Sequence, residues 1–467
     1  MVFMILGIIS CIHVLFRART SHGAIAWGIS LICLPKLALP LYWVLGRDRF
    51  QGYVKLSRAA SYLKSHAKEV EDFLSGMRSY RSEKLSGVPE ALSTFEAMAD
   101  VPCSDGNDIL LLEDGEAIFS TLFQEIEKAR AYILVSFFIL RGDDTGSLLK
   151  DKLLKKAEEG VKVYVLYDRL GSLRLPNRHV REMRDAGVEI YPFTSTPRRG
   201  VFSQLQVNFR NHRKIVVVDG ETGFVGGSNI GDEYYGKKGH WRETHLCLKG
   251  PAVKGLQLTF LEDFHWAVGK IPKKLLWTVP ASNCGDQTAV FIPTGPSDER
   301  NEGLLFFLQS IHAAERRLWM ASPYFIPDPA VKEALKLAAL RGVDVRIIIP
   351  KRTDILVCHL AAFAYFYEFE KTGVKFFRYN AGQAHQKVCL IDDKFAWVGS
   401  SNWDTRSMRL NFEGNLLVAD KAFCTEIEEM LLKDQSKSEV FCFKDRRRDR
   451  FLFSGAVAFA RLFSPIL

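Results

Sequence analysis

The sequence predicts an α/β protein made of two tandem repeats related by a pseudo-twofold axis, with a hydrophobic hairpin ahead of them. Three observations support this fold class. Apolar runs of strand length alternate with helical stretches, which is typical of an α/β sheet. Residues 317–379 repeat the pattern of residues 131–193, and residues 2–16 and 24–45 are almost wholly apolar. We therefore expect a duplicated globular body behind an N-terminal anchor.

The N-terminal segment, residues 1–46, contains the two hydrophobic runs, 2–16 and 24–45. A membrane helix needs about 20 apolar residues, so a membrane hairpin is the leading interpretation. A cleaved signal peptide agrees less well, because no small-residue cleavage site follows the first run. Lys36 lies between two prolines of the second run, so one segment can instead be re-entrant or interfacial. The larger cluster of Arg and Lys follows the second run, which predicts a cytoplasmic body.

Residues 47–104 are polar and helix-permissive, and we expect them to form a connector that ends at the turn-forming sequence CSDGND. The first half of the body, residues 105–280, follows. Its apolar runs predict strands at 131–139, 161–168 and 187–193, with a helix at 147–160. Strands that alternate with helices favour a mostly parallel sheet.

The second half, residues 281–443, repeats this plan. Its expected strands are 317–327, 343–350 and 373–379, with a helix at 330–342. Aligning Ser136 with Ser322 gives an offset of 186 residues, Gly160 with Gly342 gives 182, and Gly187 with Gly373 gives 186 again. A register shared over this distance favours internal duplication. Residues 444–467 join a basic cluster to a short apolar stretch, which predicts an amphipathic segment at the membrane interface or a helix docked on the body.

Each half contains the same polar motif, H-x-K-x4-D-x6-G-[GS]-x-N, within residues 206–233 and 379–406. The matching residues are His212, Lys214, Asp219 and Asn229 in the first half and His385, Lys387, Asp392 and Asn402 in the second. A single histidine beside a strand is usually a packed core or edge residue. Recurrence of the whole motif at the matching place in a duplicated chain indicates a functional site instead.

The spacing of the motif is suited to binding a phosphate. Residues two apart on a strand point to the same face, so each half presents an imidazole beside an ammonium group. Two lysines and two asparagines can hold the non-bridging oxygens of a phosphodiester without a metal ion. One imidazole can attack phosphorus while the other protonates the leaving alcohol and deprotonates the incoming one. Glu243 and Glu413 are candidates to hold the second ring nitrogen of each histidine.

The paired motifs resemble those of the phospholipase D superfamily, and the resemblance continues into GGSNIGDEY (226–234), WRETHL (241–246), SPYFIPD (322–328) and SSNWDTRSMRLNFE (400–413). Together with the hairpin, they make the chain similar to the bacterial cardiolipin synthases. The resemblance implies two phospholipase D-like α/β repeats with pseudo-twofold symmetry. It implies an active site made of His212, Lys214, Asp219, His385, Lys387 and Asp392, supported by Asn229, Asn402, Glu243 and Glu413. The aspartates are expected to organise the strand and turn.

The resemblance also implies a reaction. One phosphatidylglycerol gives its phosphatidyl group to an enzyme histidine and releases glycerol, and a second phosphatidylglycerol takes the group to form cardiolipin. We assign His212 as the nucleophile and His385 as the acid and base, in a sequence that is nearly symmetric. No metal and no other cofactor is expected.

The composition agrees with an anionic lipid substrate, because a net charge of +9 favours an anionic partner. We expect anionic phospholipids and the bacterial inner membrane as partners, a catalytic body in the cytoplasm, and no nucleic acid. The first alternative is a phospholipase D that hydrolyses lipids or exchanges head groups through the same intermediate. The second is a phosphodiesterase acting on nucleic acid, which agrees less well with the hairpin.

Overall fold

The computed structural model describes residues 2–18, 21–46, 50, 53, 76–77, 80–82, 90–194, 208–237, 239, 241–272, 275, 284–442 and 451–467. Most of the expected connector, the expected boundary at residue 280 and the basic residues 444–450 lie outside these ranges. A short helix, α5 (Glu90–Glu96), precedes the body.

The first half begins with β1 (Ser104–Glu113) and ends with α10 (Val253–Val268). Between them lie α6 (Asp114–Lys128), β2 (Tyr132–Phe137), α7 (Asp144–Glu158), β3 (Lys162–Asp168), α8 (Asn177–Asp185), β4 (Glu189–Phe193), β5 (Arg210–Asn211), β6 (Ile215–Val218), β7 (Thr222–Gly226), α9 (Asp232–Tyr235), β8 (Trp241–Arg242) and β9 (Thr244–Lys249). The three expected strands are β2, β3 and β4. Helix α7 begins three residues earlier than expected, because the Asp143 side chain caps it by accepting from the Gly146 N–H.

The second half begins with β10 (Gln287–Thr294) and ends with β20 (Ser438–Val440). Between them lie α11 (Glu302–His312), β11 (Arg317–Ala321), β12 (Phe325–Ile326), α12 (Pro329–Leu340), β13 (Asp344–Pro350), α13 (Leu356–Glu368), β14 (Lys375–Tyr379), β15 (Gln383–Ala384), β16 (Val388–Ile391), β17 (Phe395–Gly399), β18 (Trp403–Asp404), α14 (Thr405–Arg409), β19 (Asn411–Val418) and α15 (Lys421–Ser436). The expected strand 317–327 divides into β11 and β12, because β12 leaves the main sheet to pair with β18.

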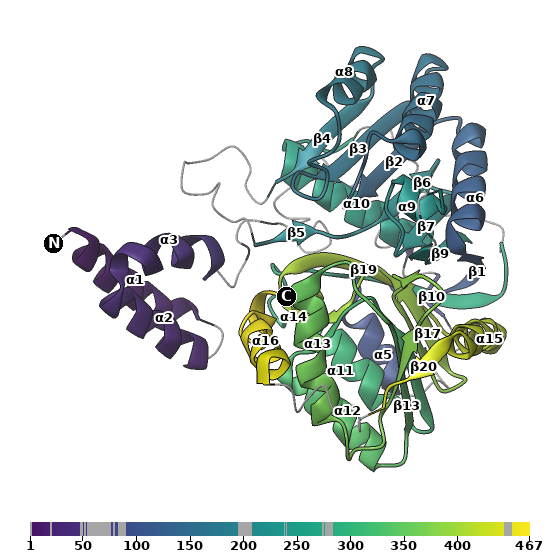
Figure 1. Cartoon of the computed structure of the whole chain (residues 1–467). Coiled ribbons are helices and arrows are strands. Elements are labelled where there is room, and N and C mark those ends of the chain that lie inside the picture. The colour runs from purple at the N-terminus through teal and green to yellow at the C-terminus, as the bar shows by residue number, and fades with distance from the viewer. Residues whose placement is uncertain are drawn as a thin grey trace.

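One sheet runs through both halves of the described body, in the order β20-β14-β13-β11-β16-β17-β19-β10-β1-β9-β7-β6-β2-β3-β4. At its centre β1 and β10 are antiparallel neighbours. On the β1 side of this pair the strands follow in the order β9, β7, β6, β2, β3 and β4. On the β10 side the equivalent strands follow in the same order, as β19, β17, β16, β11, β13 and β14. This matching order confirms the predicted α/β fold with two similar halves (Figure 1).

The expected mostly parallel sheet is wrong for the strands that carry the motif. In each half three strands are parallel, β2 with β3 and β4, and β11 with β13 and β14. The motif strands β6 and β16 are antiparallel to both neighbours. A tight turn follows each of them, with φ of 51° at Asp219 and 54° at Asp392. Short turns join antiparallel strands, whereas parallel strands need a long crossover.

Helices cover both faces of the sheet. Helices α10 and α15 bury their apolar residues in one core with β2, β6 and β16. Helices α6 and α7 pack on the opposite face of the first half, and α11, α12 and α13 pack on that of the second. The motif strands are therefore buried on both sides, which fixes the direction of the polar residues at their ends.

Two short strand pairs join the halves. β5 pairs in parallel with the start of β19, and β15 pairs in parallel with β8. β5 ends immediately before His212, and its partner residues in β19 end at Phe412, immediately before Glu413. β15 ends immediately before His385, and its partner β8 ends immediately before Glu243. This register brings each motif histidine beside a glutamate of the other half.

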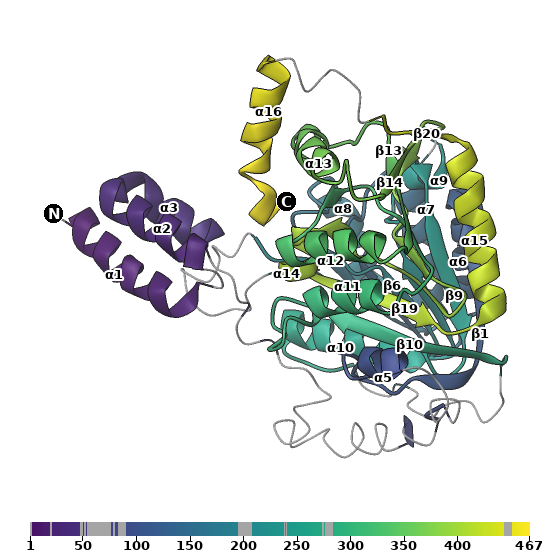
Figure 2. The ribbon, with the colours of Figure 1, turned by 90° about the horizontal axis from the view of Figure 1, so that it is seen from below.

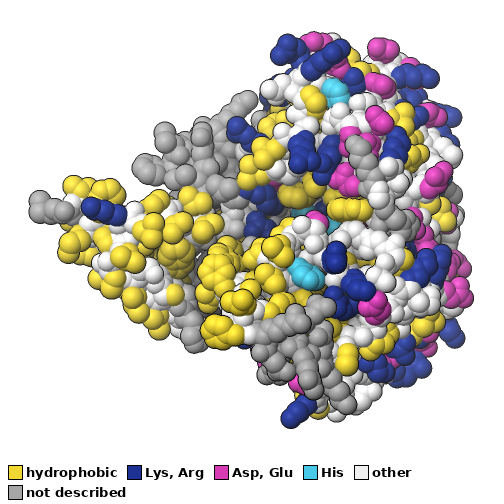
Figure 3. Space-filling view, in the orientation of Figure 1, with side chains coloured by type: hydrophobic (Ala, Val, Ile, Leu, Met, Phe, Trp, Pro, Cys, Tyr) yellow, Lys and Arg dark blue, Asp and Glu magenta, His cyan; other side chains and the backbone are white. Residues whose placement is uncertain are grey.

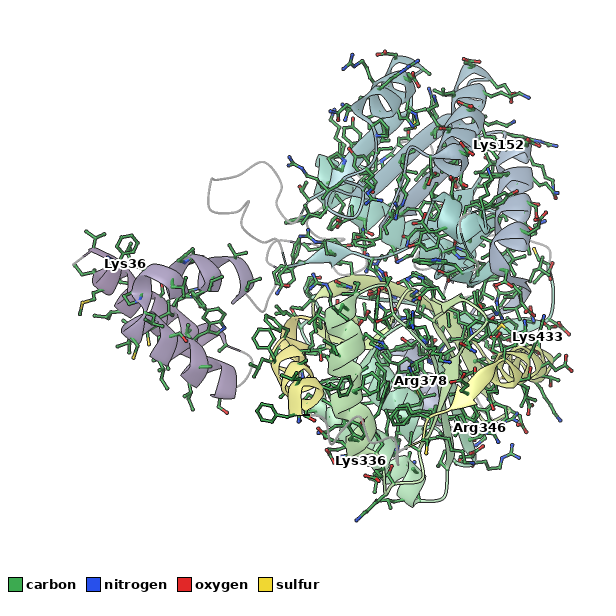
Figure 4. All side chains as sticks on the ribbon, in the orientation of Figure 1. Lys36, Lys152, Lys336, Arg346, Arg378 and Lys433 are labelled. Carbon is green, nitrogen blue, oxygen red and sulfur yellow. The ribbon has the colours of Figure 1, made fainter. Side chains whose placement is uncertain are left out.

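Three helices form a separate N-terminal bundle: α1 (Val2–Arg17), α2 (Ser21–Cys33) and α3 (Pro35–Leu45). The expected run 24–45 divides at Leu34, because Pro35 begins a new helix. Among the described residues, no helix combines the length and apolar character needed to cross a membrane. Lys36 is exposed on α3, away from the two-half body (Figure 4).

The C-terminal helix α16 (Phe451–Arg461) packs on the body and also exposes apolar side chains. Its Phe453 ring lies 5.2 Å from that of Phe363 on α13, and Arg461 forms an ion pair with Glu368 at 2.7 Å. Phe451 and Leu452 are nevertheless 89% and 85% exposed. Helix α16 lies on the side of the body that faces the N-terminal bundle (Figure 2), and hydrophobic side chains cover both (Figure 3).

Candidate active site

The first motif is positioned by the strand pair between the halves. The backbone N–H of His212 donates to the carbonyl of Phe412 at 2.9 Å, which continues the β5–β19 pairing by one residue. Lys214 is fully buried, and its Nζ donates to the His212 carbonyl at 2.7 Å. His212 and Lys214 precede β6 rather than lying within it, and the buried strand holds them at its end.

The second motif has the equivalent arrangement. The backbone N–H of His385 donates to the carbonyl of Arg242 at 2.9 Å. Lys387 is fully buried, donates to the His385 carbonyl, and places its Nζ 2.9 Å from His385 Nδ1. In each half the lysine nitrogen therefore lies on the backbone carbonyl of its own motif histidine.

The two carboxylates are exchanged between the halves. His212 donates from Nδ1 to Glu413 at 2.9 Å, and His385 donates from Nδ1 to Glu243. Both glutamates are fully buried. A carboxylate on Nδ1 fixes the ring orientation and the tautomer, so the Nε2 lone pair of a neutral ring is free to react.

The two glutamates have different surroundings. Three further groups donate to Glu413: the hydroxyls of Ser400 and Ser407, the latter at 2.8 Å, and the amide of Asn411 at 3.1 Å. Glu243 Oε2 is buried and has no hydrogen-bond partner among the described residues. The matching residue to Ser400 in the first half is Gly227, and a Cβ there would meet Glu243 Oε2 at 2.5 Å.

Burial controls the charge of the site. It lowers the pKa of His212 to about 4, although Glu413 opposes this shift. It also lowers the pKa of His385, with help from the charge of Lys387. The pKa of Lys387 falls to about 8 and that of Lys214 falls well below its usual value, again chiefly through burial. Both histidines of the free protein are therefore neutral near pH 7.

Burial raises the pKa of the two glutamates, but their partners outweigh it. The interactions with His385 and Lys387 lower the pKa of Glu243, and those with His212 and Lys214 do the same for Glu413. Both carboxylates are therefore ionised near neutral pH. Each lies beside an imidazole that it can stabilise when that ring gains a positive charge.

Aromatic rings enclose the histidines on different sides. The Phe138 ring centroid lies 5.0 Å from that of His212. Around His385, the Trp241 and Tyr234 ring centroids lie at 5.1 Å and 5.7 Å. These contacts leave His212 and His385 only 8% and 6% exposed, so the site admits little water.

The motif aspartates lie at the far end of the motif strands from the histidines. Asp219 accepts from the backbone N–H groups of residues 130, 131 and 132, each at 2.8 Å. Asp392 accepts in the same way from residues 315, 316 and 317. Both carboxylates organise the turn after the strand, which is the arrangement expected for structural residues.

The two motif asparagines differ in their hydrogen bonds. Asn229 accepts from the Ile139 N–H at 3.1 Å and donates to the Tyr234 hydroxyl at 3.0 Å. Asn402 is 5% exposed, and its Oδ1 has no hydrogen-bond partner among the described residues. Asn229 therefore fixes the aromatic wall beside His385.

A buried ion pair next to His212 does not follow from the motif. Arg213 donates to Asp263 at 2.7 Å and to the Glu413 carbonyl at 2.9 Å. Asp263 also accepts from the Asn211 amide at 2.8 Å and from the Tyr53 hydroxyl at 2.7 Å. The residues on either side of His212 are thus tied to α10 and to the segment that follows the N-terminal bundle.

Comparisons with known proteins agree with this geometry. The family model described as "Cardiolipin synthase, PLD-like domain" matches residues 122–261 and 307–435. The chain is 43% identical over 467 residues to cardiolipin synthase A of Pseudomonas entomophila (strain L48), covering 99% of this chain and 96% of the relative. It is also 43% identical over 466 residues to cardiolipin synthase A of Pseudomonas putida (strain W619), with the same coverage of both chains.

A solved structure shares the fold at much lower sequence identity. The crystal structure of phosphatidylserine synthase from Haemophilus influenzae Rd KW20 superposes with a TM-score of 0.61 at 15% identity, covering 77% of this chain and 95% of that one. At this identity the likeness concerns the fold alone. The family model, the full-length relatives and the duplicated motif lead to one conclusion: the chain belongs to the cardiolipin synthase family of phospholipase D-like enzymes.

Proposed function

We propose that this protein transfers a phosphatidyl group from one phosphatidylglycerol to another through a phosphohistidine intermediate, giving cardiolipin and glycerol. Curated relatives named cardiolipin synthase A align over nearly the whole chain. The observation that carries the mechanism is the pair of buried histidines, each held at Nδ1 by a glutamate of the other half. Two such imidazoles are what a double displacement at phosphorus requires.

In the first step, Nε2 of His212 attacks phosphorus and the bond from phosphorus to the glycerol oxygen breaks. His385 gives its proton to that oxygen, so glycerol leaves as a neutral alcohol. Lys214 and Lys387 stabilise the negative charge that develops on the non-bridging oxygens. The low pKa of His212 keeps its ring neutral and able to attack.

In the second step, a terminal hydroxyl of another phosphatidylglycerol gives its proton to His385. The alcohol oxygen forms the new bond to phosphorus as the bond from phosphorus to nitrogen breaks, and His212 returns to its neutral form. Water entering at this stage would give phosphatidic acid instead. The burial of both histidines supports transfer over hydrolysis, because it restricts the entry of water.

His385 must hold a proton before the first step. Burial and Lys387 lower its pKa in the free protein. A bound phosphodiester brings a negative charge to the same site, which raises the pKa of both the imidazole and the ammonium group. Substrate binding therefore favours the protonated form of His385, which is the acid of the first step.

We further propose that the protein works on anionic phospholipids at the bacterial inner membrane, with its catalytic body on the cytoplasmic side. The support is an apolar surface on α1–α3 and on α16, which includes Phe16 at 84% and Phe451 at 89% exposure. Apolar helices beside a basic body are suited to an acidic bilayer surface. The N-terminal bundle would act as the anchor.

Incubation of membranes that contain the protein with labelled phosphatidylglycerol, without any nucleotide, tests the reaction. Cardiolipin and glycerol should appear in equal amounts. Phosphatidic acid without cardiolipin would contradict the transferase assignment and favour a hydrolytic phospholipase D.

A lipid with a p-nitrophenyl head group separates the roles of the histidines, because nitrophenolate leaves without needing a proton. His385→Ala should still release nitrophenol and form labelled protein, whereas His212→Ala should do neither. The opposite pattern would exchange the two roles.

A further inference from the structure

The two halves differ at matched positions beside the active site. With the offset that aligns Ser136 with Ser322, Phe138 corresponds to Tyr324. With the offset that aligns Gly160 with Gly342, Ser172 corresponds to Asp354. These residues follow the C-terminal ends of the parallel strands of each half, so they occupy equivalent places on opposite sides of the site.

On the side of His212 these positions are apolar or internally bonded. The Phe138 ring contacts His212, and Lys214 Nζ lies 5.5 Å from the centroid of the same ring. Ser172 is buried; its hydroxyl donates to the Phe138 carbonyl at 3.1 Å and accepts from the Leu140 N–H at 2.9 Å. No carboxylate is presented to the substrate from these two positions.

On the side of His385 the same positions form a phenol and carboxylate pair. The Tyr324 hydroxyl donates to Asp354 Oδ1 at 2.8 Å. The Tyr324 backbone is fixed by Ser322, whose hydroxyl donates to the Tyr324 carbonyl at 2.8 Å and accepts from the N–H of Trp403, the residue after Asn402. Tyr324 is thus fastened to the second motif.

Asp354 acts electrostatically on the reacting groups and keeps an accessible carboxylate. Burial lowers the pKa of His385 and of Lys387, and in both cases the negative charge of Asp354 opposes the shift. The Asp354 side chain is exposed, and among the described residues its one hydrogen-bond partner is Tyr324. Its second oxygen is therefore available to a ligand.

A carboxylate here works against binding of the phosphate, because like charges repel at short range. A neutral polyol has the opposite preference, since its hydroxyls donate well to a carboxylate. We propose that Asp354 and Tyr324 form the subsite that binds the glycerol hydroxyls of the head group on the His385 side of the active site. This proposal rests on the proposed function and names the part of the site that selects the alcohol.

One subsite serves both steps. It holds the glycerol of the donor lipid while His385 protonates the leaving oxygen. It then holds the head group of the second lipid, so that a terminal hydroxyl faces His385 and phosphorus. Asp354 accepts hydrogen bonds and takes no proton from substrate, so the balance of the reaction is unchanged.

The variants Asp354→Asn and Tyr324→Phe test the subsite, with Asp151→Asn as a matched control at an exposed aspartate on α7. With phosphatidylglycerol as the lipid, Asp354→Asn should lower the ratio of cardiolipin to phosphatidic acid by about 10-fold or more, the size of a lost hydrogen bond to a charged group. Tyr324→Phe should lower it by a smaller factor.

Two further readouts separate alcohol recognition from a structural role. Nitrophenol release from the p-nitrophenyl lipid should stay within about threefold of the unchanged protein in Asp354→Asn, because that leaving group has no hydroxyls to bind. With glycerol and ethanol competing as acceptors, the preference for glycerol should fall about 10-fold. Asp151→Asn should change neither.

Equal losses with both lipids, or an unchanged preference for glycerol over ethanol, would overturn the subsite. Failure of the unchanged protein to make cardiolipin from phosphatidylglycerol would instead overturn the proposed function. The acceptor competition can be measured with the nitrophenyl lipid as donor, so the two failures remain distinguishable.

Discussion

Replacement of Glu413 by Gln should slow formation of the phosphohistidine far more than its small change in shape suggests. The carboxylate accepts from His212, Ser400, Ser407 and Asn411. An amide has a donor in place of one of the two acceptor oxygens. When that donor faces His212 Nδ1, the ring proton moves to Nε2 and removes the lone pair that attacks phosphorus.

The magnitude follows from the bond that is lost. A hydrogen bond to a charged group contributes about 1.5–3 kcal/mol. If this energy is realised as the histidine becomes positively charged, its loss corresponds to a rate decrease of roughly 10- to 150-fold. The changed tautomer adds to this decrease. Because Glu413 raises the pKa of His212, its loss should also move the acid limb of the pH profile to lower pH.

Nitrophenol release from the p-nitrophenyl lipid measures this step directly. Glu243→Gln is the matched variant, and it should affect nitrophenol release much less, because Glu243 contacts His385 and the leaving group needs no proton. Circular dichroism and a thermal unfolding curve would establish that both variants are folded. Release by Glu413→Gln within threefold of the unchanged protein would refute the orienting role.

Three other predictions concern stability, pH and packing. Asp263→Asn leaves the buried Arg213 guanidinium without its charged partner, so denaturant unfolding should show a loss of about 3–5 kcal/mol, and no loss would contradict a buried ion pair. Nitrophenol release from the p-nitrophenyl lipid, which needs no proton from His385, should fall in kcat/KM as pH rises through about 8, because Lys387 is charged below its pKa and neutral above it; a flat alkaline profile would exclude a role for its charge. Gly227→Ala places a methyl group 2.5 Å from Glu243 Oε2, so transfer should fall at least about 10-fold while nitrophenol release is largely kept, and normal transfer would show that this contact relaxes.

The duplication could be predicted from the sequence because the matched residues keep nearly constant offsets and the motif occurs twice. The exchange of glutamates could not. Glu243 follows His212 by 31 residues and Glu413 follows His385 by 28, so proximity in the chain favours pairing within each half. The pairing is set instead by the β5–β19 and β15–β8 contacts, which depend on how the halves dock.

The surroundings of His212 show a second limit of sequence reasoning. Arg213 looks like one of many surface cations, because charged residues are mostly exposed. It is 1% exposed, since Asp263 and Tyr53, which are 50 and 160 residues away, meet it inside the fold. In the N-terminal segment, by contrast, the position of Pro35 could have predicted that the apolar run 24–45 divides into two helices at Leu34.

The contacts between the halves also bear on how such a protein evolves. In a dimer of identical chains, every substitution appears on both sides of the symmetry axis. Here the halves share one chain and can change separately. The position occupied by Ser400 in the second half is Gly227 in the first, and the position occupied by Asp354 is Ser172. Each half still depends on the other for the carboxylate that holds its histidine. Fusion of the repeats therefore lets the two sides specialise while the exchanged glutamates prevent either from acting alone.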